Sequence, residues 1–217
     1  FNLILKEKKN FEFSLLTAHK SHKILLKQAK ALNVKNLILK NKKDYEILKQ
    51  KTKNSKIRVF NDFSQLEKIF KNKIDYTMSS ISGIQGLEPT IKIIKFTKKI
   101  AIANKESIIC GWNLIQSQLN KHKTEFIPVD SEHFSIWYGL KNYKSKDLEN
   151  IFLTASGGPF YKTSLNKFKK IKVSDALKHP NWKMGKKIST DSATMINKVY
   201  EVIEAKKLFD IKYQKIK

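Results

Sequence analysis

The chain has 217 residues, 41% of them hydrophobic, with 44 basic against 19 acidic side chains and a net charge of +25. This length can hold one large domain or two small ones, and the 13 Phe residues can build a core. No run of 18 apolar residues occurs, and residues 1–9 do not resemble a signal peptide, so the sequence predicts no membrane partner. A single cysteine, Cys110, excludes an internal disulfide framework and favours a cytoplasmic protein, and we expect its thiol to be packed and buried.

The strong positive charge suggests nucleic-acid binding, but the pattern of basic residues argues against it. Almost all of the excess is lysine, spread along the whole chain, and the only arginine is Arg58. Arginine clusters and basic–aromatic motifs are absent from the sequence. We therefore expect a solvated lysine surface and no nucleic-acid partner. A non-catalytic basic domain that binds RNA or another anionic surface stays open as an alternative.

Apolar runs alternate with helical spacing along the first 120 residues. Strands are predicted at 12–18, 36–39, 56–60, 75–82 and 99–103. Helices are predicted at 21–32, 44–51, 64–70, 87–96 and 107–120, with Ser64 as an N-cap and Pro89 in a first turn. Strict alternation of this kind predicts an α/β fold with a Rossmann-like, doubly wound parallel sheet, followed by part of an α/β catalytic domain.

A dinucleotide-binding fold normally begins with a strand and a G-x-G-x-x-G turn, and neither is found before residue 12. Residues 1–8 instead indicate the tail of a helix. The predicted sheet is therefore incomplete at its N-terminus. We expect the chain to be an internal piece of a longer protein and to be inactive alone.

Three acids further along the chain are candidates for a metal site. Asp130 and Glu132 follow the apolar run 126–129, and in an extended segment alternate side chains share a face. Glu201 lies four residues after Asn197 on a predicted helix, so these two side chains also share a face, with Lys198 at its edge. Carboxylate oxygens suit Mg²⁺ or Mn²⁺. Solvated surface acids are the alternative.

Two segments that contain glycine and proline are candidates for binding an anion or closing over a ligand. Residues 156–159 (SGGP) follow a predicted strand at 151–154 and form a tight turn whose backbone N–H groups suit an anion. Residues 179–185 (HPNWKMG) are too rich in Pro and Gly to be helical. This segment forms either a mobile loop that places His179 and Trp182 over a ligand or a loop whose Trp packs on the core.

Five segments in this order closely resemble those of the 1-deoxy-D-xylulose 5-phosphate reductoisomerases. They are 103–107 (ANKES), 128–133 (PVDSEH), 153–160 (LTASGGPF), 179–182 (HPNW) and 188–198 (ISTDSATMINK). The resemblance implies an NADPH-dependent enzyme of the methylerythritol phosphate route to isoprenoid precursors. It would convert 1-deoxy-D-xylulose 5-phosphate to 2-C-methyl-D-erythritol 4-phosphate by a metal-assisted rearrangement followed by hydride reduction.

The resemblance also implies roles for individual residues. The catalytic set would be the metal ligands Asp130, Glu132 and Glu201 together with Lys105. The substrate would be bound by Lys105, Ser131, Glu132, Ser156, His179, Trp182, Met184, Ser192, Asn197, Lys198 and Glu201. NADPH would be bound by Lys20, Asn104, Glu106 and Gly185. Residues 1–125 would form the truncated NADPH-binding domain and 126–217 the N-terminal part of the catalytic domain.

By this resemblance we expect the chain to lack the family's N-terminal Gly-rich turn and its C-terminal helical domain. Within the matching part, the chain departs from the family pattern at two places. Residues 19–21 are His-Lys-Ser where the family has Gly-Lys/Arg-Asn, so the resemblance carries no expectation for His19 or Ser21. Residues 199–200 are Val-Tyr where the family usually has Gly-Leu. The implied partners are a small sugar phosphate and, for the full-length protein, a second copy. The other rival, a different NADP-dependent dehydrogenase, would not need three metal carboxylates.

Overall fold

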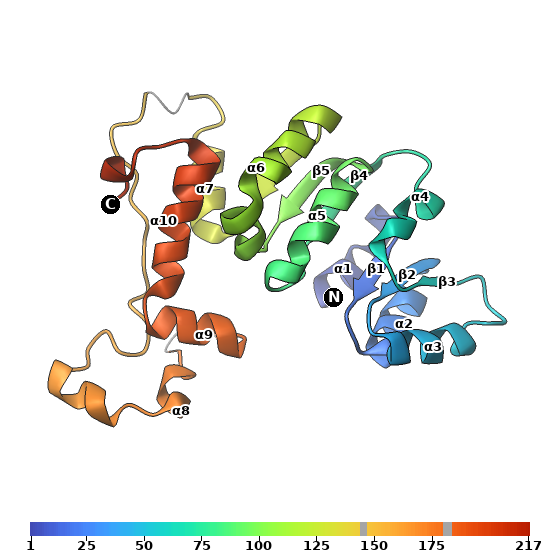
Figure 1. Ribbon diagram of the computed structural model, residues 1–217, viewed down its shortest axis with the longest axis horizontal. Helices are drawn as coiled ribbons and strands as arrows, with labels where there is room; N and C mark the ends of the chain where they lie inside the picture. Colours follow the sequence, from blue (N-terminus) through green and yellow to red (C-terminus); the bar gives the residue numbers. More distant parts are fainter. Residues whose placement is uncertain (144–146, 180–183) are drawn as a thin grey trace. The chain divides into compact units, whose positions relative to one another are not determined.

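The structure, a computed structural model, describes residues 1–143, 147–179 and 184–217 (Figure 1). Strands and helices alternate along the chain, which confirms the predicted α/β class. The chain divides into two compact units, Phe1–Lys73 and Ile74–Lys217. Among the described residues no helix combines the length and the apolar character needed to cross a membrane.

The first unit is a three-stranded parallel sheet with short helices. Its elements are α1 (Asn2–Lys6), η1 (Lys8–Asn10), β1 (Leu16–Ala18), α2 (His22–Ala31), β2 (Asn36–Leu39), α3 (Lys42–Lys51), β3 (Arg58–Phe60), η2 (Phe63–Gln65) and α4 (Leu66–Ile69). The strand order is β1-β2-β3, with β2 in the centre. All three strands are parallel, as the alternation of strands and helices predicted.

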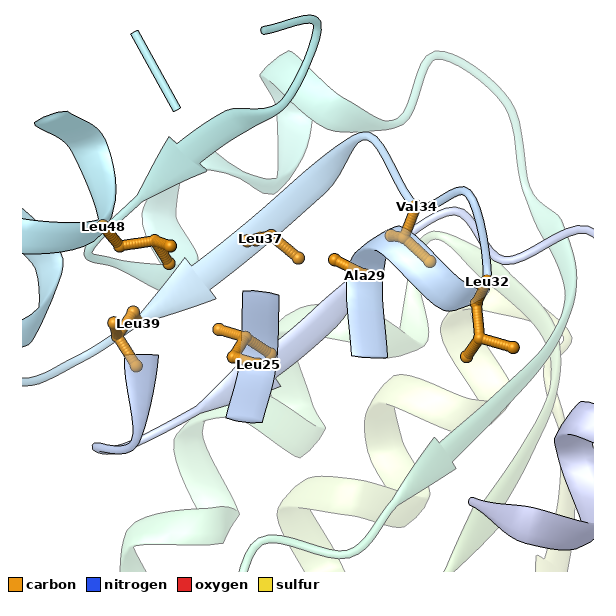
Figure 2. Close-up of a cluster of buried hydrophobic side chains, with 7 residues drawn as sticks. All are labelled: Leu25, Ala29, Leu32, Val34, Leu37, Leu39 and Leu48. Atoms are coloured by element: carbon orange, nitrogen blue, oxygen red, sulfur yellow. The ribbon is translucent and has the colours of Figure 1, made fainter. Parts of the chain in front are cut away.

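The core of this unit lies between α2, α3 and β2 (Figure 2). Its buried members are Leu25, Ala29, Leu32, Val34, Leu37, Leu39 and Leu48. Leu25 and Ala29 of α2 and its C-cap residue Leu32 recur at helical spacing, so one face of the helix is apolar. On β2 the residues Leu37, Ile38 and Leu39 are all fully buried, as expected for a central parallel strand covered on both faces.

Two local predictions in this unit are wrong at their boundaries. The first strand begins at Leu16 rather than at residue 12, because the residues before Leu16 pair with no neighbouring strand. Ser64 is not an N-cap, because the carboxylate of Asp62 takes that role and accepts a hydrogen bond of 2.6 Å from the Ser64 backbone N–H. A carboxylate two residues earlier therefore replaces the serine hydroxyl as the cap.

The second unit contains a second three-stranded parallel sheet and a helical region that follows it. Its elements are β4 (Ile74–Ser79), η3 (Ile84–Gly86), α5 (Leu87–Ile94), β5 (Thr97–Ile102), α6 (Lys105–His122), β6 (Glu125–Pro128), α7 (Ser131–Gly139), η5 (Leu165–Lys170), α8 (Val173–Ala176), α9 (Lys186–Ala193), α10 (Ile196–Phe209) and η6 (Tyr213–Lys215). The strand order is β4-β5-β6. Helix α10 packs against α6, α7 and α9 (Figure 1).

The parallel strands of each unit bear out the Rossmann-like class, although the strands do not form one continuous sheet. The six described strands form two sheets of three, one in each unit. The strand predicted at 151–154 is also shorter than expected. Only Ile151 makes a strand-like bridge there, with Ile216.

The register of the second sheet decides where the following loops begin. Ser79 at the end of β4 pairs with Ile102 at the end of β5, and Ile102 pairs with Pro128 at the end of β6. The three strands therefore end at the same edge, where ligands commonly bind in α/β folds. Helices α6 and α7 both begin within three residues of this edge.

Cys110 on α6 is exposed, so the prediction of a buried thiol is wrong. The buried residues Ser107, Ile108, Gly111 and Trp112 follow the inner face of the helix. Position 110 falls on the opposite face because the helix turns by about 100° per residue. Pro89 does lie in the first turn of α5, as predicted, and is buried there.

Two adjacent residues on α2 give a test of this core. Leu25 is 3% exposed and Ile24 is 59% exposed. We expect Leu25→Ala to lower the free energy of opening around β2 by about 2–5 kcal/mol, because it removes buried methyl groups and leaves a cavity. Ile24→Ala should change it by less than about 0.5 kcal/mol. Hydrogen exchange of the β2 amides measures both, and equal effects would contradict the described core.

Candidate active site

Lys105 is fixed at the edge of the second sheet by the way α6 begins. Asn104 caps this helix by accepting a hydrogen bond from the Ser107 backbone N–H, and its side-chain NH₂ donates to the carbonyl of Gly83 at 2.8 Å. The asparagine is 3% exposed, so the cap joins the loop after β4 to the start of α6. Lys105, the first residue of the helix, then lies 2.9 Å from a carboxylate oxygen of Asp130.

Asp130 and Glu132 come together, but the predicted extended segment is wrong. The strand ends at Pro128, Asp130 is the N-cap residue of α7, and Glu132 lies in the first turn of that helix. Two acids at a helix N-terminus face the positive end of the helix dipole, which stabilises their charged forms. Ser131 supports the arrangement by donating a hydrogen bond of 2.7 Å to Glu132.

Helix α10 supplies the third acid from the other end of the sequence. Asn197 and Glu201 lie one turn apart, and the asparagine NH₂ donates to Glu201 Oε1. The carbonyl oxygen of the same asparagine accepts a 2.6 Å hydrogen bond from Lys105 Nζ. The predicted i,i+4 pair on one helix face is present, and it connects α10 to the start of α6.

The carboxylates of Asp130, Glu132 and Glu201 offer oxygen atoms that all lie within 4.8 Å of one another. Lys198 Nζ lies 3.2 Å from Glu132 and also contacts Glu201, while Lys105 contacts Asp130. Two ammonium groups therefore occupy positions where positive charge is favourable among three acids. Three hard oxygen ligands at this spacing fit a divalent cation such as Mg²⁺ or Mn²⁺.

The pKa values of Glu132 and Glu201 are shifted in opposite directions. Burial raises the pKa of Glu132, but its hydrogen bond from Ser131 and the charge of Lys198 outweigh that effect and bring its pKa to about 2. Burial raises the pKa of Glu201, and the negative charges nearby add to the increase. A buried carboxylate with a raised pKa favours added positive charge, which a bound divalent cation would supply.

Two residues of this region were missed by the sequence reasoning. His133 and Glu204 are both buried, and together with Asp130 they form a second group whose ligand atoms lie within 4.8 Å of one another. The available signal was their spacing, since His133 follows Asp130 and Glu204 follows Glu201 by three residues. His133 and Glu204 therefore each lie on the same helix face as a predicted metal ligand.

The predicted phosphate-binding residues come together in three contacts between distant segments. Ser156 Oγ and His179 Nε2 share a hydrogen bond of 3.0 Å. Lys198 donates to the carbonyl of Thr154. Gly158, with a φ of +65°, lies so close to α9 that a Cβ there would be 2.7 Å from the carbonyl oxygen of Ser192. The glycine turn thus lies against the end of α9.

The loop after His179 is described only in part. Trp182 lies outside the described residues, so its predicted contact with the substrate has no structural counterpart here. Met184 is half-buried, and Gly185 is the N-cap of α9, where its carbonyl accepts a 3.0 Å hydrogen bond from the Ser189 backbone N–H.

The residues predicted to bind the cofactor fall in both units. Glu106, in the first turn of α6, pairs at 2.9 Å with Lys187 of α9, which the sequence reasoning also missed. Burial would raise the pKa of Glu106, but this pairing lowers it. Lys187 also pairs at 2.6 Å with Asp191. Lys20 belongs to the first unit and is exposed just after β1.

Two family models match the chain. The model described as 1-deoxy-D-xylulose 5-phosphate reductoisomerase matches residues 1–111, and the model of the C-terminal domain of the same enzyme matches residues 126–209. A reductoisomerase of this name from Pelagibacter ubique is 59% identical over 99% of the chain and 56% of the relative. The enzyme from Wolbachia pipientis subsp. Culex pipiens is 43% identical over 99% of the chain and 55% of the relative.

Solved structures of the same enzyme are also similar. The enzyme from Zymomonas mobilis in complex with NADPH has a TM-score of 0.86 and 34% identity, covering 99% of this chain and 55% of its own. A complex of DOX-P reductoisomerase with NADPH, fosmidomycin and magnesium has a TM-score of 0.87 and 30% identity, covering 98% and 55%. The chain spans about half the length of the curated relatives it matches. It belongs to the 1-deoxy-D-xylulose 5-phosphate reductoisomerase family.

Proposed function

We propose that the chain contributes the metal and substrate residues of an NADPH-dependent enzyme that converts 1-deoxy-D-xylulose 5-phosphate to 2-C-methyl-D-erythritol 4-phosphate. The proposal rests on one cluster of carboxylates. Asp130 and Glu132 at the start of α7 lie close to Glu201 of α10, and the ammonium groups of Lys105 and Lys198 contact these acids. A relative of this family was solved with NADPH, fosmidomycin and magnesium, which supports the same ligand classes here.

Asp130, Glu132 and Glu201 would hold one divalent cation, Mg²⁺ or Mn²⁺. Such an ion supplies Lewis-acid stabilisation for a ketone oxygen and a neighbouring hydroxyl. The chain itself would orient the substrate at this edge of the sheet through Ser131 and Glu132. Side-chain exposures of 18% for Asp130 and 21% for Glu132 leave the cluster accessible to a small molecule.

Lys105 would place a fixed positive charge against the reacting oxygens. Burial alone would lower the pKa of its ammonium group, but the charge of Asp130 and their hydrogen bond outweigh burial and raise the pKa. The side chain therefore stays protonated and acts as a donor rather than as a base. Its contacts with Asp130 and Asn197 determine where that donor lies.

The phosphate end of the substrate would be bound by residues from three segments. They are Ser156, His179, Ser192, Asn197 and Lys198. The glycine turn at 157–158 adds backbone N–H groups close to α9, and Lys198 adds a positive charge. Contacts to a part of the substrate that does not react supply binding energy for positioning. Trp182 and Met184 would lie in the loop that closes over the substrate.

Four residues would bind NADPH. Lys20 after β1 would pair with the 2′-phosphate, and Asn104, Glu106 and Gly185 would border the cofactor near the substrate. Residues 1–125 would form the NADPH-binding domain, and 126–217 the N-terminal part of the catalytic domain. We also propose a cytoplasmic homodimer that acts on a small sugar phosphate, with no nucleic-acid partner.

The proposal is tested with the protein expressed from its full reading frame, assayed for NADPH oxidation with 1-deoxy-D-xylulose 5-phosphate. Activity should disappear with a chelator and return with Mn²⁺. Glu132→Gln should lower kcat by at least about 100-fold, because a ligand that stabilises developing charge is worth several kcal/mol. No turnover by the metal-loaded wild type would overturn the proposed reaction.

The phosphate site predicts a different kinetic signature. Ser192→Ala should raise the substrate KM by about 3- to 10-fold and Lys198→Ala by more, since these groups would bind the phosphate equally in the ground and transition states. Val199→Ala, at an exposed neighbouring position on α10, serves as the control and should change KM little. An unchanged KM in both phosphate-site variants would contradict this assignment.

The glycine turn gives a third test in the same enzyme. Gly158→Ala forces a side chain into a left-handed backbone region, at about 1–2 kcal/mol, and brings a Cβ to 2.7 Å from the Ser192 carbonyl. The turn should move away from α9 and the substrate KM should rise about tenfold. Gly139→Ala is the matched control, because nothing lies within 4 Å of its added Cβ. Similar KM values for the two variants would show that the turn does not bind substrate.

A further inference from the structure

His133 and Glu204 form a buried pair beside the predicted metal ligands, and the reaction proposed above uses neither side chain. The histidine is 0% and the glutamate 1% exposed. His133 Nδ1 and Glu204 Oε2 lie 3.7 Å apart, and neither atom has a hydrogen-bond partner among the described residues. Buried polar atoms almost always have partners in folded proteins, so two such atoms facing each other need an explanation.

The other ring nitrogen of His133 fixes the orientation of the imidazole. Nε2 lies 2.9 Å from the backbone carbonyl oxygen of Glu201, and because a carbonyl only accepts, Nε2–H is the donor. The ring also stacks on Phe209 of α10, with centroids 6.3 Å apart. His133 is therefore held by the backbone of one predicted metal ligand, and its Nδ1 lies 3.9 Å from the carboxylate of another, Asp130.

A cation bound by Asp130, His133 and Glu204 is the first alternative to consider. The two clusters together contain the carboxylates of Asp130, Glu132, Glu201 and Glu204 and the ammonium groups of Lys105 and Lys198. Asp130 belongs to both clusters, so a second ion would lie close to the first, and the two positive charges would repel each other. The His133–Glu204 side is also enclosed, whereas a catalytic metal keeps an open position for substrate.

We propose that Glu204 and His133 share one hydrogen bond and act as a positioning pair for the metal ligands Asp130 and Glu201. Closing the 3.7 Å gap by less than an ångström gives a normal hydrogen bond of about 2.8–2.9 Å. The chain of contacts then runs from Glu204 through the imidazole to the Glu201 carbonyl, and it ties α10 to α7. Supporting contacts of this kind orient the ligands of metal sites. The inference rests on the reaction proposed above.

Each member of the pair lies one helical turn from the ligand that it supports. Glu204 follows Glu201 on α10, and His133 follows Asp130 on α7. Movement between the two helices would therefore shift both carboxylates, and the shared hydrogen bond opposes that movement. Neither His133 nor Glu204 needs to touch the substrate for this role.

The test compares Glu204→Gln with Glu204→Leu in the full-length enzyme. The glutamine NH₂ can donate to His133 Nδ1, whereas leucine keeps similar bulk and makes no hydrogen bond. Glu204→Leu should weaken Mn²⁺ binding, measured by electron paramagnetic resonance of the free ion, by about 10- to 100-fold and lower kcat more than it raises the substrate KM. Glu204→Gln should stay within about threefold of the wild type, because it keeps the supporting contact. Glu88→Gln, at an exposed acid of α5, controls for lost charge.

His133→Gln keeps the proposal testable if the leucine variant fails to fold. This glutamine can still donate to the Glu201 carbonyl but offers no nitrogen in the place of Nδ1. It should weaken Mn²⁺ binding, and Glu204→Ala should weaken binding much less in this variant than in the wild type, since both changes remove one contact. Fully additive losses would overturn the shared hydrogen bond.

Three results would overturn the pair's positioning role. In the first, Glu204→Leu binds Mn²⁺ as tightly as the wild type. In the second, Glu204→Gln binds Mn²⁺ as weakly as Glu204→Leu. In the third, the wild type binds two Mn²⁺ ions per chain. The second and third results would indicate that Glu204 itself coordinates Mn²⁺. A wild type that binds Mn²⁺ but does not turn over the substrate would instead overturn the proposed reaction, and the metal-binding comparison would still decide the role of the pair.

Discussion

Negative charge buried at the carboxyl edge of the second sheet is the constraint on which the rest of the site depends. Four carboxylates from α7 and α10 come close together there, and removing them from water is costly unless positive charge accompanies them. Lys105 and Lys198 supply part of that charge through direct ion pairs. The pairing also raises the pKa of Lys105 although burial opposes it, which shows that the field of the acids is the stronger effect.

The fold concentrates this charge because parallel strands end at one edge. The register of β4, β5 and β6 brings the starts of α6 and α7 to the same place, and α10 packs against both helices. Asn104 fixes the position of Lys105, because its buried side-chain amide caps α6 and also hydrogen-bonds to the loop after β4. Core packing therefore determines the positions of the charges, and the site itself is built from helix ends.

Much of the site could be predicted from the spacing of residues within single helices. The contacts between residues far apart in the sequence could not. Asn197 and Glu201 lie four residues apart on a helix, and this separation alone places them on one face. Asp130 and Glu132 were expected in an extended segment because an apolar run precedes them, yet the sequence Asp-Ser-Glu after a proline also fits a helix start, and the helix formed. The spacing of His133 and Glu204 places each one turn from a predicted metal ligand, but it does not show that they face each other, because that contact joins two helices.

Lys198 connects the two halves of the site, since its ammonium group contacts Glu132, Glu201 and the carbonyl of Thr154 just before the glycine turn. Within the proposed function, its charge has two uses that compete: it can neutralise the carboxylates or it can bind the phosphate. A divalent cation among the carboxylates would neutralise them and leave Lys198 to the anion. Metal and substrate binding should then favour one another, because the same lysine responds to both.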